Sequence, residues 1–247
     1  MKDSLRLIAG RTLAWLLQLR SRPYPFRAGP VLVVSPHADD ETLGCGGLLA
    51  LKRQRGEDVT VVYLTDSAGS PEAGGSADRS ARRQSEAWAA LAVLGVPRDR
   101  AFFLQAPDGC LNRLPPDQRA RVVGTLATRL SEIRPTEVFV PFLGGGSTEH
   151  DAAVEITREA LRAAGLAADV WEYPVWAWWD PRRLAGQLGR PHENFHVVLG
   201  SARATKQAAL ACHVSQVEPA IAGGSPDLPR VLARLATGPV EFFFLRK

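Results

Sequence analysis

The stretch VLVVSPHADDE, residues 31–41, decides the expected fold because an apolar run gives way at once to a polar turn. Its first half is typical of a strand buried on both faces, and its acidic end is typical of a first helical turn. A second apolar run, Val138–Phe142, is followed by GGGSTEH, which ends at His150. Ligands of open α/β sheets bind at the carboxyl ends of parallel strands. The two segments therefore predict a site where His37, Asp40 and His150 meet at one edge of a sheet.

Short β-branched runs alternate with stretches of helical period along the rest of the chain. This alternation predicts repeated βα units, and so an α/β fold: a Rossmann-like three-layer sandwich with a mainly parallel sheet. No linker is long or polar enough to divide the chain. We therefore expect a single domain at 29–247, preceded by an N-terminal amphipathic helix and lead-in at 1–28. The expected strands are Val31–Val34, Val59–Leu64, Ala101–Phe103, Glu137–Phe142, Asp169–Tyr173, Phe195–Val198 and Val240–Leu245. The expected helices are Glu41–Arg55, Arg79–Leu94, Asp117–Ile133, Asp151–Ala164, Ala202–Cys212 and Leu228–Leu235.

Composition excludes several classes of protein. The chain has 247 residues, of which 45% are hydrophobic and 23% charged, as in ordinary globular proteins. Its net charge of +4 is spread over single arginines without a basic block, so we expect no nucleic-acid partner. Three distant cysteines, Cys45, Cys110 and Cys212, predict reduced thiols rather than a disulfide framework, and with them a cytoplasmic protein. The oligomeric state is left open.

An amphipathic stretch, Leu5–Leu19, begins the chain with basic residues around it. Arg6 and Arg11 break its apolar runs, which are too short to span a bilayer. No small-residue cleavage site follows an apolar core, so the stretch is a poor secretory signal. We expect a helix packed against the domain. Attachment to an anionic membrane surface through Trp15-Leu16-Leu17 is the alternative.

The residue types at the predicted sheet edge favour a catalytic metal. Two imidazoles and one carboxylate, here His37, His150 and Asp40, are typical ligands of a catalytic zinc ion whose fourth position is open. Zinc lowers the pKa of water to near neutrality and polarises a substrate carbonyl. Asp39 lies beside a ligand but outside the ligand set, so we expect it to be the general base. An acidic N-cap and first helical turn is the alternative interpretation of residues 39–41.

Four motifs resemble a known family. Residues 36–47, PHADDETLGCGG, closely resemble the P/A-H-x-D-D-E…G-x-G-G signature of the LmbE-like, or PIG-L, zinc de-N-acetylases. Arg83-Gln84-Ser85-Glu86, Ala106-Pro107-Asp108-Gly109 and Lys206…His213-Val214-Ser215-Gln216 are similar to later motifs of that family, in the same order. The resemblance implies a Rossmann-like α/β fold for 29–247. It also implies hydrolysis of an N-acetyl group from an amino sugar or its conjugate, a small-molecule substrate, with one Zn²⁺ per chain. Iron is the alternative metal for such ligands.

The resemblance also implies roles for single residues. By position, His37, Asp40 and His150 match the metal ligands, Asp39 matches the base, and Asp108 falls in the P-D-G turn that we expect to contact substrate.

One departure concerns the second metal motif, which in the family is H-x-D-H or H-x-N-H but here is Ser147-Thr148-Glu149-His150. The family's first histidine of that motif helps to stabilise the oxyanion. Either Ser147, as a substrate-binding residue, donates a weaker hydrogen bond, or His213 takes over. Losing such a donor typically costs about 10²–10³ in rate. The hypothesis that His213 serves the oxyanion fails if His213→Ala leaves turnover unchanged.

Several features keep two interpretations. The aromatic segment Trp171–Trp179 would stack on a sugar or pack in the core or at a dimer contact. The loop Ser67–Asp78 is either a mobile lid or an exposed connection. Gly44-Cys45-Gly46-Gly47 lies too far beyond the strand for a dinucleotide fingerprint, and indicates close helix–sheet contact instead. Two other functions remain: a zinc amidase or esterase acting on a non-sugar natural product, and a catalytically weak accessory or binding protein.

Overall fold

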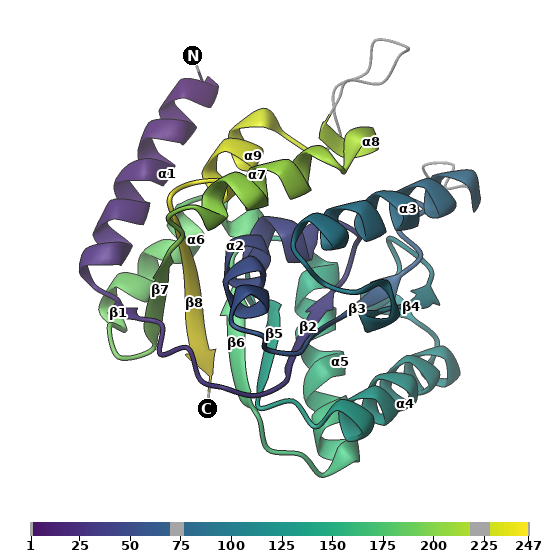
Figure 1. Cartoon of the computed structure of the whole chain (residues 1–247). Helices are drawn as coiled ribbons and strands as arrows, with labels where there is room; N and C mark the ends of the chain where they lie inside the picture. Colours follow the sequence, from purple (N-terminus) through teal and green to yellow (C-terminus); the bar gives the residue numbers. More distant parts are fainter. Residues whose placement is uncertain (1, 70–76, 218–227, 247) are drawn as a thin grey trace.

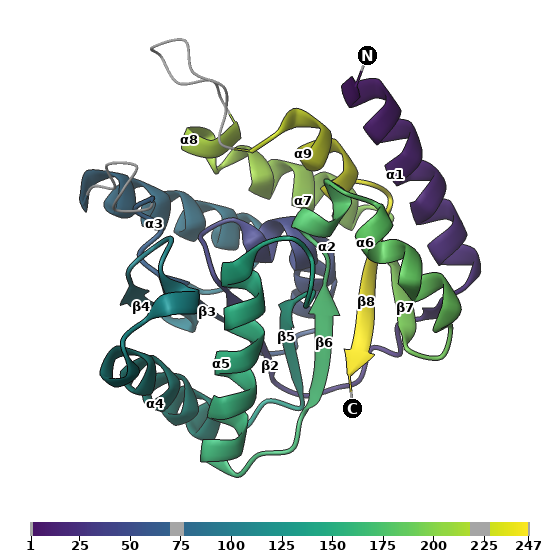
Figure 2. The same cartoon turned by 180° about the vertical axis from the view of Figure 1, so that it is seen from behind.

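A mostly parallel sheet between two layers of helices organises the chain, as the alternating pattern predicted (Figures 1 and 2). The computed structural model describes residues 2–69, 77–217 and 228–246. In these residues the eight strands lie in the order β1-β7-β8-β6-β5-β2-β3-β4. Their bounds are β1 Arg22–Pro23, β2 Val31–Ser35, β3 Val59–Thr65, β4 Ala101–Ala106, β5 Glu137–Pro141, β6 Asp169–Tyr173, β7 Asn194–Val198 and β8 Val240–Arg246.

The register brings the ends of the central strands together. Val31 of β2 pairs with Val59 of β3 on one side and with Glu137 of β5 on the other, and both pairings are parallel. The carboxyl ends of these three strands therefore lie at the same edge of the sheet. β8 runs antiparallel between β6 and β7, while the other pairs of described strands are parallel.

The helices divide between the two faces of the sheet. Helices α2, α3 and α7 pack together on one face, and α4 packs with α5 on the other. Each layer encloses an apolar core, one under α2 and one under α4 and α5. The longer helices are α1 Lys2–Leu19, α2 Asp40–Gln54, α3 Ala77–Val93, α4 Pro116–Ile133, α5 Thr148–Ala164 and α7 Ala202–Ala211. The shorter ones are α6 Arg182–Ala185, α8 Val214–Val217, α9 Arg230–Ala236 and the 3₁₀ helices η2 Arg98–Arg100, η3 Leu111–Arg113, η4 Trp176–Trp178 and η5 Gly186–Gly189.

Helix α4 shows why the periodic stretches become helices. Its residues Val122, Leu126 and Leu130 recur at helical spacing and are buried against the sheet. Burying each such side chain contributes about 1.5–3 kcal/mol. Pro116 begins the helix, where its missing N–H costs nothing, and Arg134 ends it in the left-handed conformation.

Two glycines let α2 lie directly on the sheet and on the segment after β7. A Cβ atom on Gly44 would lie 2.1 Å from Tyr173 Cδ2, and one on Gly47 would lie 2.3 Å from Leu199 Cδ2. The backbone N–H of Gly47 also donates to Glu241 Oε1 at 2.8 Å. These contacts support the interpretation of this run as a helix–sheet contact, and they hold the first turn of α2 at the carboxyl edge of β2.

Because that contact has no room for a methyl group, Gly44→Ala is expected to destabilise the fold by about 1–3 kcal/mol. Tyr173 is fully buried and its hydroxyl donates to Val34 O at 2.8 Å, so the ring cannot move aside freely. Chemical denaturation measures the change. Gly124→Ala is the matched control: Gly124 lies in α4 with no atom within 4 Å of a built Cβ, and alanine there should not destabilise. Equal stability of Gly44→Ala and the parent protein would contradict this account.

Helix α1 lies against α9 at one side of the domain (Figure 1). Leu13 and Leu17 are buried on its inner face, and a Cβ on Gly10 would meet Leu235 Cδ1 at 2.7 Å. Among the described residues, no helix combines the length and apolarity needed to cross a bilayer.

Candidate metal centre

Three side chains from two distant segments converge at the carboxyl edge of the sheet. His37 lies in the turn after β2, Asp40 is the first residue of α2, and His150 lies in the first turn of α5. His37 Nδ1 is 3.2 Å from Asp40 Oδ2, and His150 Nε2 is 3.2 Å from Asp40 Oδ1. One donor atom from each residue lies within 4.8 Å of the other two. The arrangement that the two strand-end motifs predicted is therefore present in the fold.

The polar atoms of this cluster fit a divalent cation. His150 is buried, and its Nε2 makes no hydrogen bond with the described residues although it lies near the Asp40 carboxylate. A buried polar atom without a partner is costly unless something else binds it. Two imidazole nitrogens and a carboxylate oxygen are ligands that zinc prefers, and three protein ligands leave a position open for chemistry. The residues present therefore fit a zinc ion.

The other nitrogen of His37 is held by two carboxylates. His37 Nε2 lies 2.8 Å from Glu149 Oε2 and 3.2 Å from Asp108 Oδ1. The backbone N–H of Leu111 donates to Glu149 Oε1 at 3.0 Å, and that of Gly69 donates to Asp108 Oδ2 at 2.7 Å. Such carboxylates fix the tautomer and the ring orientation of a metal-binding histidine. With the proton on Nε2, His37 turns the lone pair of Nδ1 toward Asp40.

A second cluster, His37 with Asp108 and Glu149, also has metal-ligating atoms within 4.8 Å. Its two carboxylates already accept backbone hydrogen bonds, whereas His150 Nε2, which lies 3.2 Å from Asp40 Oδ1 without a hydrogen bond among the described residues, belongs to the first cluster. His37, Asp40 and His150 are therefore the cluster that fits a cation better.

The charges of the cluster favour an ionised carboxylate at its centre. Burial opposes ionisation of Asp40, yet His150 and His37 hold the pKa of Asp40 well below its usual range. Burial would lower the pKa of His37, but its hydrogen bonds to Asp108, Asp40 and Glu149 raise the pKa well above its ordinary value. A divalent cation would compete with the proton for this negative surrounding.

Asp39 occupies the N-cap position of α2 without performing its usual function. Its carboxylate makes no capping hydrogen bond to the helix and instead lines a cavity beside His37 and Asp40. Burial, followed by the charge of Asp40, raises the pKa of Asp39 to about 6. The structure thus gives Asp39 a side chain directed to the cavity rather than to the helix end.

The cavity has a volume of about 170 Å³ and combines polar and apolar walls. Arg83 and Gln216 line it although the sequence alone did not single them out as contact residues. Gln216 is anchored because its Nε2 donates to Ala38 O at 2.7 Å. Both belong to motifs of the family resemblance, which was the available signal. The full lining consists of His37, Asp39, Asp40, Leu43, Arg83, Asp108, Trp176, Gln216 and Leu228.

The aromatic segment Trp171–Trp179 divides between the two interpretations. Trp171 and Trp178 are buried in the apolar core, whereas Trp176 lines the cavity. Trp179 packs elsewhere, with the Arg6 guanidinium 4.0 Å from its ring centre.

The two residues considered for stabilising the oxyanion, Ser147 and His213, have different surroundings. Ser147 is the N-cap of α5, and its hydroxyl accepts a hydrogen bond from the His150 N–H at 3.3 Å. His213 is fully buried, with Nε2 3.3 Å from Thr42 Oγ1 and 3.6 Å from Glu41 Oε1. Neither is among the residues that line the cavity. Contact of either with substrate therefore stays a prediction.

The loops around the site are defined in part. Gly144 and Gly146 have positive φ values of 77° and 105°, which lets the turn after β5 lead into α5 and place His150. Of the loop Ser67–Asp78, residues 70–76 lie outside the described part of the chain, so the lid and connection interpretations both stand. The described cysteines are free, as predicted.

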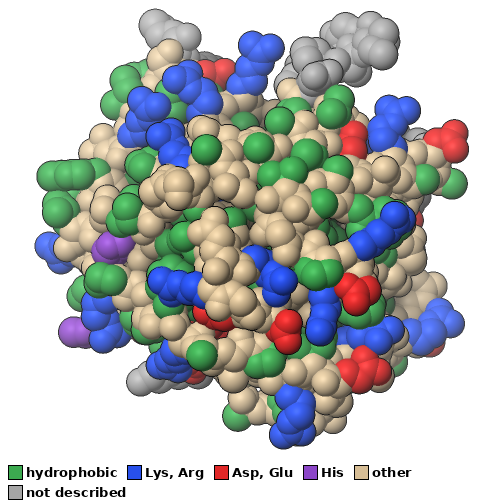
Figure 3. Space-filling model, in the orientation of Figure 1, with side chains coloured by type: hydrophobic (Ala, Val, Ile, Leu, Met, Phe, Trp, Pro, Cys, Tyr) green, Lys and Arg blue, Asp and Glu red, His purple; other side chains and the backbone are tan. Residues whose placement is uncertain are grey.

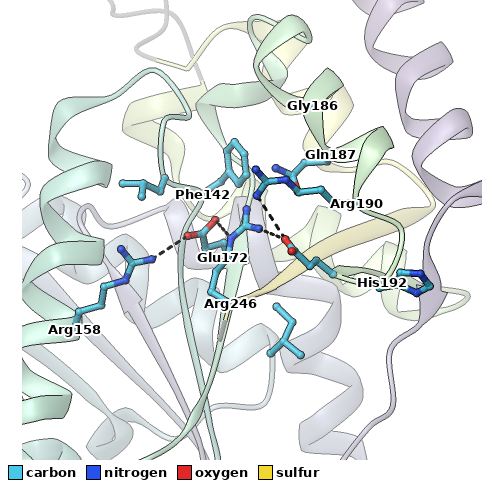
Figure 4. Close-up of a pocket in the computed structure, with 11 residues that line it drawn as sticks. Phe142, Arg158, Glu172, Gly186, Gln187, Arg190, His192 and Arg246 are labelled. Atoms are coloured by element: carbon cyan, nitrogen blue, oxygen red, sulfur yellow. Dashed lines mark hydrogen bonds and ion pairs between the residues drawn. The ribbon is translucent and has the colours of Figure 1, made fainter.

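A larger cavity, about 710 Å³, lies on another part of the sheet (Figure 4). Its floor is an ion-pair network in which Arg246 Nε donates to Glu172 Oε2 and Arg246 Nη1 donates to Glu193 Oε2, both at 2.8 Å. Arg158 of α5 lies at one wall and Arg190 at the other. None of the converging metal-ligating residues lines it, so its greater volume does not make it the reaction site.

Glu149→Gln is expected to weaken Zn²⁺ binding by about 10–100-fold while the fold is kept. The amide has the shape of the carboxylate but lacks the charge that orients and polarises the His37 ring. Competition with a chromophoric chelator measures the affinity. Glu155→Gln is the matched control, because Glu155 lies on the same helix with its side chain 62% exposed. An unchanged Zn²⁺ affinity of Glu149→Gln would show that Glu149 does not contribute to the metal centre.

The sequence and the fold both match known proteins. A family model described as PIG-L: GlcNAc-PI de-N-acetylase matches residues 32–161, just over half of the chain and all three converging residues. The 1D-myo-inositol 2-acetamido-2-deoxy-alpha-D-glucopyranoside deacetylase of Mycolicibacterium vanbaalenii is 33% identical over 171 residues, 60% of this chain. The match spans 58% of that relative, less than two thirds of its length.

Two solved structures share the fold. The conserved protein TT1542 from Thermus thermophilus is 27% identical with a TM-score of 0.54, over 76% of this chain and 80% of that one. The A40926 pseudoaglycone deacetylase Dbv21 is 23% identical with a TM-score of 0.65, over 89% of this chain and 97% of that one. At this identity the second likeness concerns the fold alone.

Proposed function

The chain belongs to the PIG-L family of GlcNAc-PI de-N-acetylases, and we propose that it is a metal-dependent hydrolase that removes the acetyl group from an N-acetylated amino-sugar conjugate. The observation that carries the proposal is the position of Asp39. Its carboxylate is free of the helix end and lines the same cavity as His37 and Asp40. A proton acceptor beside a metal-ligating set is the arrangement that metal-assisted amide hydrolysis uses.

In this proposal the chain's own residues hold the zinc ion, orient its ligand His37 and transfer the proton. His37, Asp40 and His150 would hold a zinc ion, and Glu149 and Asp108 would orient His37. When bound, zinc lowers the pKa of water and polarises a carbonyl group. Asp39 would take the proton from the attacking water at its carboxylate and return it to the nitrogen of the departing amine.

The cavity walls support an acetylated sugar as the substrate class. Trp176 presents an aromatic face, and Arg83 and Asp108 present polar groups, in one cavity of about 170 Å³. Sugar rings are recognised by this combination of a flat apolar surface and a few polar groups. The cavity is small, so we propose that it takes the acetamido end while the remainder of the conjugate lies outside.

In this proposal His213 serves the oxyanion from a position next to the cavity lining, since its Nδ1 lies 3.5 Å from Nε2 of Gln216, which lines the cavity. Its pKa is raised: burial opposes the charge, but the hydrogen bond and the negative charge of Glu41 outweigh burial. His213→Ala should lower turnover by about 10²–10³-fold if the residue stabilises the oxyanion. Steady-state turnover, with thermal unfolding to check the fold, measures this. Unchanged turnover would reject the role and leave His213 as a structural partner of Glu41.

Acetate release tests the proposed function. The Zn²⁺-loaded chain is incubated with N-acetylglucosaminyl conjugates and, separately, with simple acetamides and acetate esters, and mass spectrometry follows loss of the acetyl group. Turnover of the conjugates alone supports the proposal. Preference for the simple compounds would indicate an amidase or esterase, and absence of turnover on every compound by the loaded protein would indicate an accessory or binding protein.

A further inference from the structure

The outer face of α1 carries a stripe of exposed apolar side chains. At about 100° per residue, positions 5, 8, 15 and 19 fall within about 80° of one another on the helix. These positions are roughly opposite Gly10, Leu13 and Leu17, which contact the domain. The exposed fractions are 63% for Leu5, 62% for Ile8, 59% for Trp15 and 65% for Leu19.

The stripe cannot turn inward, because the opposite face of α1 is already fixed. Leu17 is fully buried and Leu13 is 7% exposed. Gly10 approaches Leu235 of α9 too closely to leave room for a Cβ. The Arg6 guanidinium stacks over Trp179 at 4.0 Å. The helix is thus a rigid part of the surface, and its apolar stripe faces away from the chain's own core.

Basic residues lie beside the stripe and at its carboxyl end. At about 100° per residue Arg11 lies about 40° from Trp15 around the helix, Arg20 directly follows the last residue of α1, and both are exposed. Residues 2–22 contain five basic residues and a single acidic one, Asp3. Figure 3 shows Lys and Arg side chains together with hydrophobic ones over the α1 side of the molecule, with little acidic surface among them.

This charge distribution selects the partner. A second copy of the chain packed stripe to stripe would bring the same arginines together, and like charges at an interface oppose association. An anionic surface would be attracted by them. A helix with an apolar face, a tryptophan in that face and basic borders lies in the interface between lipid headgroups and acyl chains. We propose that α1 docks the protein on an anionic lipid bilayer, with its axis along the surface and the stripe in the interface.

The position of α1 relates this surface to the reaction site. The amino-terminal end of α1 lies at the end of the molecule toward which β6 points, the end that carries the metal centre (Figure 2). Helix α9, on which α1 packs, also contacts η4, and η4 contains the cavity residue Trp176. A docked α1 would keep this edge of the sheet near the bilayer.

Sedimentation with lipid vesicles tests the proposal on the full chain. Vesicles of phosphatidylglycerol mixed with phosphatidylcholine should bind the protein, and vesicles of phosphatidylcholine alone should bind it much more weakly. Binding should weaken at high salt because the Debye length shortens. The double variant Arg11→Gln and Arg20→Gln should bind about 25-fold more weakly, at about fivefold per basic residue.

The apolar contribution is tested by Ile8→Gln combined with Trp15→Gln, which should reduce vesicle binding by about 100-fold. Both positions are exposed, so circular dichroism and thermal unfolding should match the parent protein; Leu5→Gln with Leu19→Gln is the second pair if they do not. Val93→Gln, an exposed aliphatic residue at the end of α3, is the matched control and should bind normally. The proposal would be overturned if the protein did not bind vesicles. It would also be overturned if neither the arginine pair nor the apolar pair of substitutions reduced binding. A dimer in sedimentation velocity that the same substitutions dissociate would overturn it as well.

Discussion

Asp39→Asn is expected to lower turnover by about 10²–10⁴-fold while Zn²⁺ stays bound. The amide fills the same space as the carboxylate but cannot accept a proton from water. Because the Asp39 side chain neither caps α2 nor belongs to the converging ligand set, its replacement should leave the proposed metal centre intact. Steady-state acetate release measures the rate, and metal analysis of the same preparation measures the zinc content.

Turnover and zinc content together distinguish between the roles of Asp39. A large loss of turnover at full zinc content supports a proton-transfer role for Asp39. Loss of zinc together with activity would place Asp39 among the ligands. Full turnover with full zinc content would mean that another group accepts the proton.

The strands were predictable because each central one is buried on both faces and is therefore a continuous apolar run in the sequence. β2, β3 and β5 have no exposed residue, and their runs were found within a residue or two of their bounds. β1 was missed because Arg22–Pro23 is two residues long and has no strand pattern of its own. It exists because tertiary structure brings Arg22 beside Phe195 of β7. The direction of β8 also could not be predicted, since apolar runs carry no information on which way a strand enters the sheet.

The convergence of the three proposed ligands was predictable for a different reason. His37 and Asp40 lie at a spacing that one helix start presents together, and His150 follows a second strand end, so topology alone brings them to one edge. The partners of His37 were not predictable in the same way. Glu149 reaches His37 because α5 and α2 both begin at the carboxyl edge of the sheet. Its other oxygen, Oε1, accepts a hydrogen bond from the backbone N–H of Leu111. A glutamate beside a histidine in sequence does not indicate such a contact.

The Glu149 contact bears on the departure from the family motif at the start of α5. The sequence replaces the first histidine of the motif by Ser147, which the structure places as a helix cap. The third residue of the motif is Glu149 where the resemblance leads one to expect Asp or Asn, and its longer side chain reaches His37 Nε2. In this chain Glu149 and His150 therefore both belong to the proposed metal centre, whereas the position of the family's first histidine is taken by a helix cap.

Asp40→Asn is expected to abolish tight Zn²⁺ binding, and with it turnover, in contrast to the same exchange one residue earlier. The Asp40 carboxylate approaches both imidazoles at 3.2 Å and is the one anionic member of the proposed ligand set. Without the charge of Asp40, the site lacks the anionic ligand that compensates zinc for the loss of its water shell. Zinc affinity should therefore fall by more than the factor of about 10–100 expected when a hydrogen-bond partner of a ligand is lost. In the parent protein the backbone N–H of His37 donates to Asp40 Oδ2 at 3.1 Å. The amide oxygen of asparagine can still accept this hydrogen bond, so the turn into α2 should persist. Chelator competition gives the affinity, and Asp39→Asn is the matched control because it removes the same charge from the adjacent position. A zinc affinity of Asp40→Asn equal to that of the parent protein would show that the cation is not held by His37, Asp40 and His150.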